Sequence, residues 1–143
     1  MKEANEISYH LTVKSSTENL AIVRDFIRKA ADETGVNTEV VHKIILAVDE
    51  ASSNIMRHAY KNNPEGEISY SFIVSGSECT VIITDQGVGF NPAAVRKPDL
   101  PVYIKEGKRG GLGMHLMKIL MDNVQYESTE SGFNKLVLTK KIA

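Results

Sequence analysis

Residues 44–60, which read IILAVDEASSNIMRHAY, are the stretch that decides the fold of this chain. The length of the stretch and its spaced apolar residues predict a helix. Glu50 and Asn54 stand four positions apart among the apolar neighbours, and so project from one face of this helix, about 5–6 Å apart at Cβ. A carboxylate beside a carboxamide can polarise a hydroxyl and hold Mg²⁺, which prefers oxygen ligands. Asp49 is offset around the helix, and we expect it on the solvated side.

A purely structural interpretation of these two residues is also open. Glu50 would then be a solvated helix residue and Asn54 an incidental polar group. The position of Asn54 weighs against this alternative, because asparagine has poor helix propensity and competes for backbone hydrogen bonds, yet here it lies in mid-helix.

The first half of the chain predicts one strand followed by two helices. Apolar and polar residues alternate over residues 7–13, which predicts a half-buried strand. The next helix would be capped by Ser16 or Thr17 and end at Gly35. The helix that contains residues 44–60 would be capped by Asn37 or Thr38 and continue to about residue 60. Its expected inward side chains are Val41, Ile44, Ile45, Val48 and Ile55.

The second half predicts two pairs of strands around one more helix. Residues 68–74 and 79–83 form a predicted hairpin around Gly76, and residues 123–128 and 135–141 form the last strands. The intervening helix, over about residues 112–121, would have its apolar stripe at Leu112, Leu116, Ile119 and Leu120. Because strands and helices do not strictly alternate, we expect an α+β two-layer sandwich, with a mixed, mostly antiparallel sheet and helices on one face.

Size and composition predict a single domain over residues 1–143. The chain is 42% hydrophobic and 24% charged, which is typical of a globular domain. Its 17 basic residues nearly balance its 18 acidic residues, so neither nucleic acid nor a membrane is expected as a partner. No signal peptide or membrane-spanning run is evident. The single cysteine, Cys79, lies in an apolar strand, which predicts a buried structural thiol and is consistent with a cytoplasmic location.

A glycine-containing turn follows the second strand of the hairpin and reads Asp85-Gln86-Gly87-Val88-Gly89. A strand-ending turn explains these glycines equally well. In a functional interpretation, Asp85 accepts a hydrogen bond from a purine amino group, and Gly87 and Gly89 let a ring or a phosphate approach the backbone.

A second glycine cluster opens the last helix and consists of Gly110, Gly111, Leu112 and Gly113. Backbone N–H groups at a helix N-terminus form an anion site. Lys105, Lys108 and Arg109 lie just upstream, where they can meet phosphate oxygens. The cluster has neither the Gly-Lys-Ser/Thr of a Walker A motif nor the βαβ context of a dinucleotide fingerprint. The long, proline-containing segment before it, about residues 91–110, predicts a lid.

The order of these motifs resembles the gyrase, MutL and histidine-kinase ATPase superfamily, and most closely the anti-sigma-factor serine kinases of bacterial partner switching. The matching stretches cover nearly the whole chain. They are Glu50-Ala51-x-x-Asn54 with His58-Ala59-Tyr60, Asp85-x-Gly87-x-Gly89-Phe90, Gly110-Gly111-Leu112-Gly113 and Leu120-Met121-Asp122. The resemblance implies a histidine-kinase-type ATPase fold, with ATP and Mg²⁺ as cofactors.

The resemblance also implies a role for each matching residue. Glu50 would be the general base that accepts the proton of the attacking hydroxyl, and Asn54 would ligate Mg²⁺. Asp85 would bind the adenine amino group, in a pocket shaped by Gly87 and Gly89. The phosphates would meet the cluster at residues 110–113, with amides of Gly111 and Gly113 and with Arg109 near the γ-phosphate. Where relatives commonly have a threonine after the last hairpin's glycine, this chain reads Gly132-Phe133-Asn134, which leaves the role of Asn134 open.

The function implied is that of a cytoplasmic serine/threonine protein kinase. It would phosphorylate an anti-sigma-factor antagonist and bind a sigma factor or an equivalent regulator, as a homodimer with contacts through the first strand and helix. The alternative is a non-catalytic, nucleotide-gated binding module, which would not need Glu50. A sensor-kinase fragment is disfavoured, because no histidine in a suitable context precedes Glu50.

Overall fold

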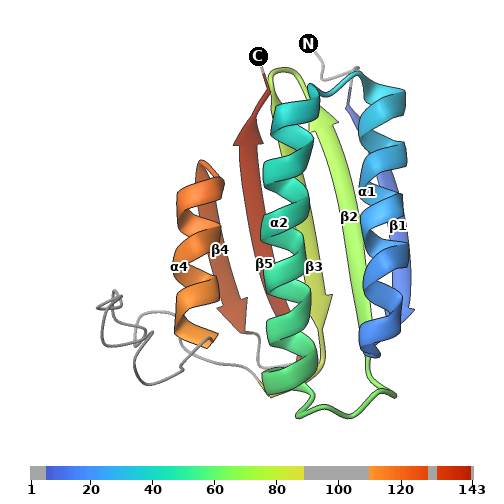
Figure 1. Cartoon of the computed structure of the whole chain (residues 1–143), viewed down its shortest axis with the longest axis vertical. Coiled ribbons are helices and arrows are strands. Elements are labelled where there is room, and N and C mark those ends of the chain that lie inside the picture. Colours follow the sequence, from blue (N-terminus) through green and yellow to red (C-terminus); the bar gives the residue numbers. More distant parts are fainter. Residues whose placement is uncertain (1–5, 89–109, 129–131, 143) are drawn as a thin grey trace.

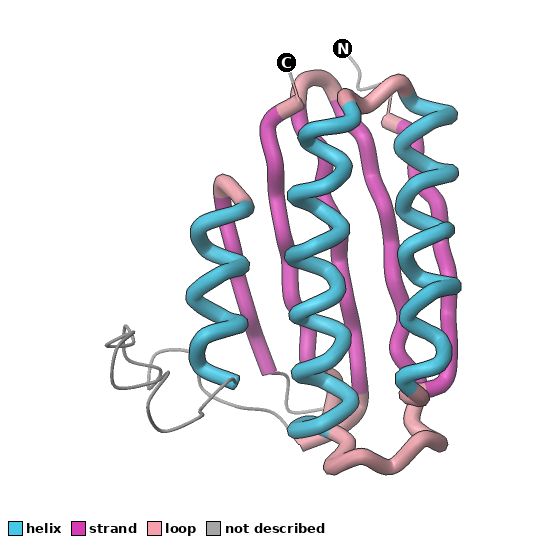
Figure 2. Tube along the Cα trace, viewed as in Figure 1, coloured by secondary structure: helices cyan, strands magenta, loops and turns pink. Residues whose placement is uncertain are grey.

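The computed structural model describes residues 6–88, 110–128 and 132–142. These residues form one sheet of five strands and, on one of its faces, three α-helices (Figure 1). The helices lie side by side across the sheet, and the other face of the sheet carries no described helix (Figure 2). None of the described helices is long and apolar enough to cross a bilayer.

The order of elements follows the predicted order. The strands are β1 (Ile7–Lys14), β2 (Glu67–Ser75), β3 (Glu78–Asp85), β4 (Asn123–Ser128) and β5 (Asn134–Lys141); the α-helices are α1 (Leu20–Thr34), α2 (Thr38–Asn54) and α4 (Gly110–Leu120). The spatial order is β1-β2-β3-β5-β4, and each pairing between described strands is antiparallel. The predicted α+β sandwich with helices on one face is therefore confirmed.

One hydrophobic core lies between the sheet and the helices. Side chains alternate along β2, β3 and most of β5, so that every second residue there is buried. The buried core-forming residues of the three central strands are Ile68, Tyr70, Phe72, Val74, Cys79, Val81, Ile83, Leu136 and Leu138. Helices α1 and α2 meet them with small and β-branched residues such as Val23, Ala30, Ile44 and Val48. Cys79 is buried in this core, as predicted.

The helix ends agree with the sequence in two places and differ in one. Asn37 caps α2, because its Oδ1 accepts a hydrogen bond from the backbone N–H of Glu39 (2.8 Å). Gly35 ends α1 in the left-handed conformation (φ +77°). The predicted cap by Ser16 or Thr17 is wrong. A 3₁₀ turn, Thr17–Asn19, precedes α1, and the Ser16 hydroxyl donates to the Glu18 carboxylate instead of to a backbone group.

The helix predicted to continue to residue 60 changes its hydrogen-bond pattern after Asn54. A π-helical turn, Ile55–Ala59, follows α2, and the N–H of Tyr60 donates to the carbonyl of Ile55 (2.9 Å). A π turn holds more residues than an α turn, and so rotates the side chains that follow. Met56 is therefore fully buried, whereas Ile55, predicted to face inward, is only partly buried.

The apolar stripe predicted for α4 is also rotated. Met117 and Met121 are buried, whereas Leu116 and Ile119 are exposed, Ile119 by 65%. Leu120 is partly buried, and the prediction for Leu112 lies outside the described side chains. Apolar residues surround most of α4, so spacing alone did not single out the face that packs.

Candidate functional site

The segments that carry the predicted site meet at one end of the molecule. Figure 1 shows the last turn of α2, the end of β3, the beginning of β5 and the first turn of α4 at the same end. Antiparallel pairing causes part of this convergence, because Asp85, the last residue of β3, pairs with Asn134, the first residue of β5. Helix α4 contacts α2.

Two adjacent carboxylates on α2 have different surroundings. Asp49 accepts two hydrogen bonds from Arg24 of α1, from Nε to Oδ1 (3.0 Å) and from Nη2 to Oδ2 (3.2 Å). Asp49 is thus half-buried in an ion pair between two helices rather than on the solvated side. Glu50 is half-buried, and no described residue donates to its carboxylate or forms an ion pair with it. Of the two carboxylates, Glu50 is the one available to a ligand.

Asn54 ends α2, one helical turn beyond Glu50. Its Oδ1 accepts a hydrogen bond from Arg57 Nη2 (3.3 Å) within the π-helical turn. The Nε atom of Arg57 is buried and has no hydrogen-bond partner among the described residues. A cation bound at Asn54 Oδ1 would therefore either share this oxygen with Arg57 or displace the Arg57 contact. Sequence reasoning did not identify Arg57, although it stands three positions after Asn54, a spacing at which helical side chains are neighbours.

Asp85, the last residue of β3, is buried, with 4% of its surface exposed. Its Oδ1 accepts from the N–H of Gly87 (2.9 Å) and from Nδ2 of Asn134 (2.8 Å). No described residue donates to Oδ2. The carboxylate is thus held by one oxygen and can accept a hydrogen bond from a ligand with the other.

The turn after β3 is attached closely to the end of the π-helical turn. The N–H of Val88 donates to the carbonyl of Ala59 (2.8 Å). A Cβ atom on Gly87 would lie 2.5 Å from the same carbonyl oxygen, so only glycine allows this approach. Gly87 is therefore needed for the packing of the turn against the helix end.

Tyr60 links the same two segments. Its hydroxyl accepts from the N–H of Gln86 (2.8 Å) and donates to the carbonyl of Glu67 (2.6 Å). Burial raises the pKa of the Tyr60 hydroxyl, the hydrogen bond from Gln86 counteracts the rise, and the charge of Asp85 adds to it. In the sequence Tyr60 was only part of a matching motif, and its bridging role requires the three-dimensional arrangement.

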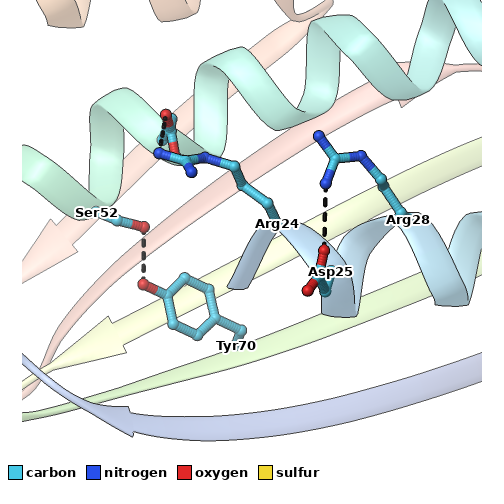
Figure 3. Close-up of polar contacts among 6 residues, drawn as sticks. Arg24, Asp25, Arg28, Ser52 and Tyr70 are labelled. Atoms are coloured by element: carbon cyan, nitrogen blue, oxygen red, sulfur yellow. Dashed lines mark hydrogen bonds and ion pairs between the residues drawn. The ribbon is translucent and has the colours of Figure 1, made fainter. Parts of the chain in front are cut away.

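A buried hydroxyl pair supports α2 on the sheet beneath the site. Ser52 Oγ and Tyr70 Oη lie 2.7 Å apart (Figure 3). Both residues are buried, and burial raises the pKa of Tyr70 to about 12. The pair attaches α2 to β2 through Ser52. Glu50 and Asn54 take no part in this contact.

The second glycine cluster opens α4 as predicted. Gly110, Gly111, Leu112 and Gly113 form its first turn, at the same end of the molecule as Asn54 and Asp85 (Figure 1). Gly89, Arg109 and the predicted lid lie outside the described residues.

The residues present are compatible with a purine nucleotide and a magnesium ion. The described residues include no group of three or more His, Cys, Asp or Glu side chains that could hold a metal by themselves. Mg²⁺ is commonly bound by one or two protein oxygens together with substrate phosphates, and Asn54 Oδ1 suits that pattern. The acceptor at Asp85 Oδ2 suits an amino group, and the helix N-terminus suits phosphate.

The family model and the similar proteins point to the same family. Residues 13–140 match the model of the histidine kinase-like ATPase domain. A serine-protein kinase RsbW from Bacillus velezensis is 32% identical over 123 residues, which cover 82% of this chain and 76% of the relative. An anti-sigma F factor from Clostridium acetobutylicum is 27% identical and covers 96% of both chains.

Two solved structures share the fold. The crystal structure of the RsbU and RsbW domains of a Mycobacterium tuberculosis protein has a TM-score of 0.69 at 17% identity, and the match covers 95% of this chain and 32% of that one. A chain of the SiaB–SiaC complex from Pseudomonas aeruginosa has a TM-score of 0.59 at 10% identity, over 92% of this chain and 88% of that one. The chain therefore belongs to the histidine kinase-like ATPase domain family, with relatives that include the serine-protein kinase RsbW.

Proposed function

We propose that this protein is a serine/threonine kinase that uses Mg²⁺ and ATP to phosphorylate an anti-sigma-factor antagonist. The observation that carries the proposal is the meeting of Glu50, Asn54, Asp85 and the first turn of α4 at one end of the sheet. Relatives named serine-protein kinase RsbW and anti-sigma F factor support both the kinase and the anti-sigma activity.

In the proposed complex, ATP spans the site from the end of β3 to the start of α4. Asp85 Oδ2 accepts from the adenine amino group, and Gly87 and Gly89 allow the ring to approach the backbone. The first turn of α4 (residues 110–113) presents amides and its positive dipole end to the phosphates, and Arg109 reaches the γ-phosphate. Asn54 would present Oδ1 to Mg²⁺, which would neutralise phosphate charge.

Phosphoryl transfer then needs one proton acceptor. The serine or threonine oxygen of the antagonist bonds to the γ-phosphorus, the bond to the β–γ bridging oxygen breaks, and ADP leaves. Glu50 accepts the hydroxyl proton. The ion pair of Asp49 with Arg24 supports this assignment, because it commits the neighbouring carboxylate and leaves Glu50 available. Most of the catalysis would come from positioning and charge.

The same chain would act as an anti-sigma factor. We propose a cytoplasmic homodimer that binds a sigma factor or an equivalent regulator in one state and the antagonist in the other. Strand β1 and helix α1 are the proposed dimer contacts, and residues 1–143 form one kinase domain with its lid at about residues 91–110.

The test compares Glu50→Gln with Asp49→Asn in a transfer assay. Each variant is mixed with Mg·ATP and a purified antagonist protein from the same organism, and phosphoserine and phosphothreonine are measured by mass spectrometry. Glu50→Gln should abolish transfer and still bind ATP, whereas Asp49→Asn should transfer phosphate. Unchanged transfer by Glu50→Gln would remove Glu50 as the base. Wild-type protein that binds ATP but yields no phosphorylated product would favour the non-catalytic binding module.

A further inference from the structure

Asn134 is a buried polar residue that the catalytic scheme above does not use. It is the first residue of β5, and only 2% of its surface is exposed. Alternation along β5 places it on the same face as Leu136 and Leu138, which belong to the core. A polar group in such a position is costly unless its hydrogen bonds are made.

The hydrogen bonds of Asn134 define the orientation of its amide. Nδ2 donates to Asp85 Oδ1 (2.8 Å) and to the carbonyl of Gly87 (2.9 Å). Oδ1 accepts from the hydroxyl of Ser128 (2.8 Å), at the end of β4. A flipped amide would place an acceptor against the carboxylate and the carbonyl, so this network permits one orientation.

The network also determines which oxygen of Asp85 a ligand meets. Asn134 Nδ2 and the Gly87 N–H both end on Oδ1. Oδ2 therefore remains the acceptor, and the carboxylate cannot rotate without losing two hydrogen bonds. An ionised carboxylate only accepts, so it suits a 6-amino purine and opposes the 6-oxo group of guanine.

We infer that Asn134 is a positioning residue that holds Asp85 for the amino group of adenine and thereby sets the preference for adenine over guanine nucleotides. The inference rests on the proposed nucleotide site. Ser128 is part of the same hydrogen-bond network, because its hydroxyl donates to Oδ1 of Asn134 and so fixes the orientation of the amide. The first residue of β5 thus contacts Asp85 directly through its side chain.

The test measures dissociation constants for ATP and GTP by calorimetry in Asn134→Asp, Asn134→Ala and Ser128→Ala. Asn134→Asp is nearly isosteric and places a second carboxylate against Asp85, which it repels as long as both are ionised; a proton on the new carboxyl would restore a hydrogen-bond donor to Asp85. We expect ATP binding to weaken about tenfold or more near neutral pH and to recover partly as the pH is lowered. Asn134→Ala should weaken ATP about five- to tenfold and reduce the ratio of GTP to ATP dissociation constants.

Controls separate this role from a structural one. Asn123→Asp makes the same chemical change at an exposed position on β4 and should leave both dissociation constants unchanged. Ser128 is exposed, so Ser128→Ala should fold normally and weaken ATP by a few fold, even if an Asn134 variant does not fold. The inference would be overturned if the wild type and all folded variants had the same dissociation constant for ATP and the same dissociation constant for GTP. The proposed nucleotide site would still stand in that case. A wild type that binds no ATP would instead overturn the proposed function, and the inference with it.

Discussion

At the residue scale, the buried polar side chains of this protein work in pairs. The structure buries four such residues among those it describes, namely Ser15, Ser52, Asp85 and Asn134. Each has a hydrogen-bond partner: Ser15 donates to the carbonyl of Asn63 (2.6 Å), and Ser52 pairs with Tyr70. Removal of one partner leaves the other buried without a hydrogen bond, which costs about 1–3 kcal/mol.

Asp85→Asn should weaken ATP binding markedly. A hydrogen bond to a charged acceptor contributes about 1.5–3 kcal/mol, so the dissociation constant should rise about tenfold to a hundredfold. Calorimetric titration with ATP measures this. Asp25→Asn is the matched control, because Asp25 is exposed on α1, where its one ion pair among the described residues is with Arg28 (Figure 3). If Asp85→Asn binds ATP as tightly as the wild type, Asp85 does not contact adenine.

The Ser52–Tyr70 pair should show a large coupling energy. Ser52→Ala and Tyr70→Phe each leave one buried hydroxyl unpaired, and each should lower the free energy of unfolding by about 1–3 kcal/mol. The double variant should lose clearly less than the sum, since it leaves no unpaired group. Urea unfolding measures all three. The exposed pair Thr12–Ser69 (3.1 Å) is the control cycle and should show almost no coupling. Additive losses at Ser52 and Tyr70 would contradict this prediction.

At the element scale, the site depends on how the turn after β3 is held against the end of α2. The two segments share the hydrogen bond from Val88 to Ala59 and the bridge through Tyr60. Ala59 is the last residue of the π-helical turn, and Tyr60 follows it directly, so this turn forms the helix end to which the segment after β3 is attached. Such turns are often found at functional sites, and in this one Arg57 donates a hydrogen bond to Asn54.

Gly87→Ala should separate these two elements. The added Cβ would lie 2.5 Å from the backbone oxygen of Ala59, which cannot move away like a flexible side chain. The turn must shift, and we expect ATP affinity to fall at least about tenfold, because Asp85 shifts with it. The control is Gly35→Ala, at φ +77° with open space around it. That variant should lose about 1–2 kcal/mol of stability and keep its ATP affinity. Equal ATP affinity in Gly87→Ala and the wild type would show that the close approach is not needed.

The sequence correctly predicted those elements whose pattern of apolar residues is compatible with only one buried face. Alternation identified the strands, and Asn37 and Gly35 identified two helix ends. The face of α4 was wrong because its apolar residues surround the helix, so that tertiary contacts, rather than spacing, select Met117 and Met121. The π-helical turn was not predicted, because an i to i+5 pattern leaves no distinct local signature.

At the scale of the whole molecule, the candidate site combines positions that only the sheet brings together. Motif order was enough to predict Glu50, Asn54 and Asp85 as site residues. Asn134, 49 residues from Asp85, becomes its neighbour only through the β3–β5 pairing. One signal was nevertheless present in the sequence. The alternation of β5 places Asn134 in phase with two leucines, on the buried face, where a polar side chain needs hydrogen-bond partners.

The core of the molecule makes stability sensitive to alkaline pH through Cys79. Burial raises the pKa of the Cys79 thiol to about 12, from an ordinary value of 9.0. The unfolded chain therefore loses this proton near pH 9, while the folded chain keeps it. The corresponding stability is fully present below that pH and is lost as the pH rises toward 12. Tyr70, whose pKa burial also raises to about 12, acts in the same direction from about pH 10.

The urea midpoint should consequently fall between about pH 8 and about pH 10.5 under reducing conditions. Cys79→Ala should start from a lower midpoint, because a small core side chain is truncated further, and should then fall less steeply over the lower part of this range. The slope difference isolates the thiol, since every other titrating group is common to both proteins. Parallel curves would mean that the thiol ionises as readily in the folded protein as in the unfolded one, and that the core around Cys79 admits either charge or water.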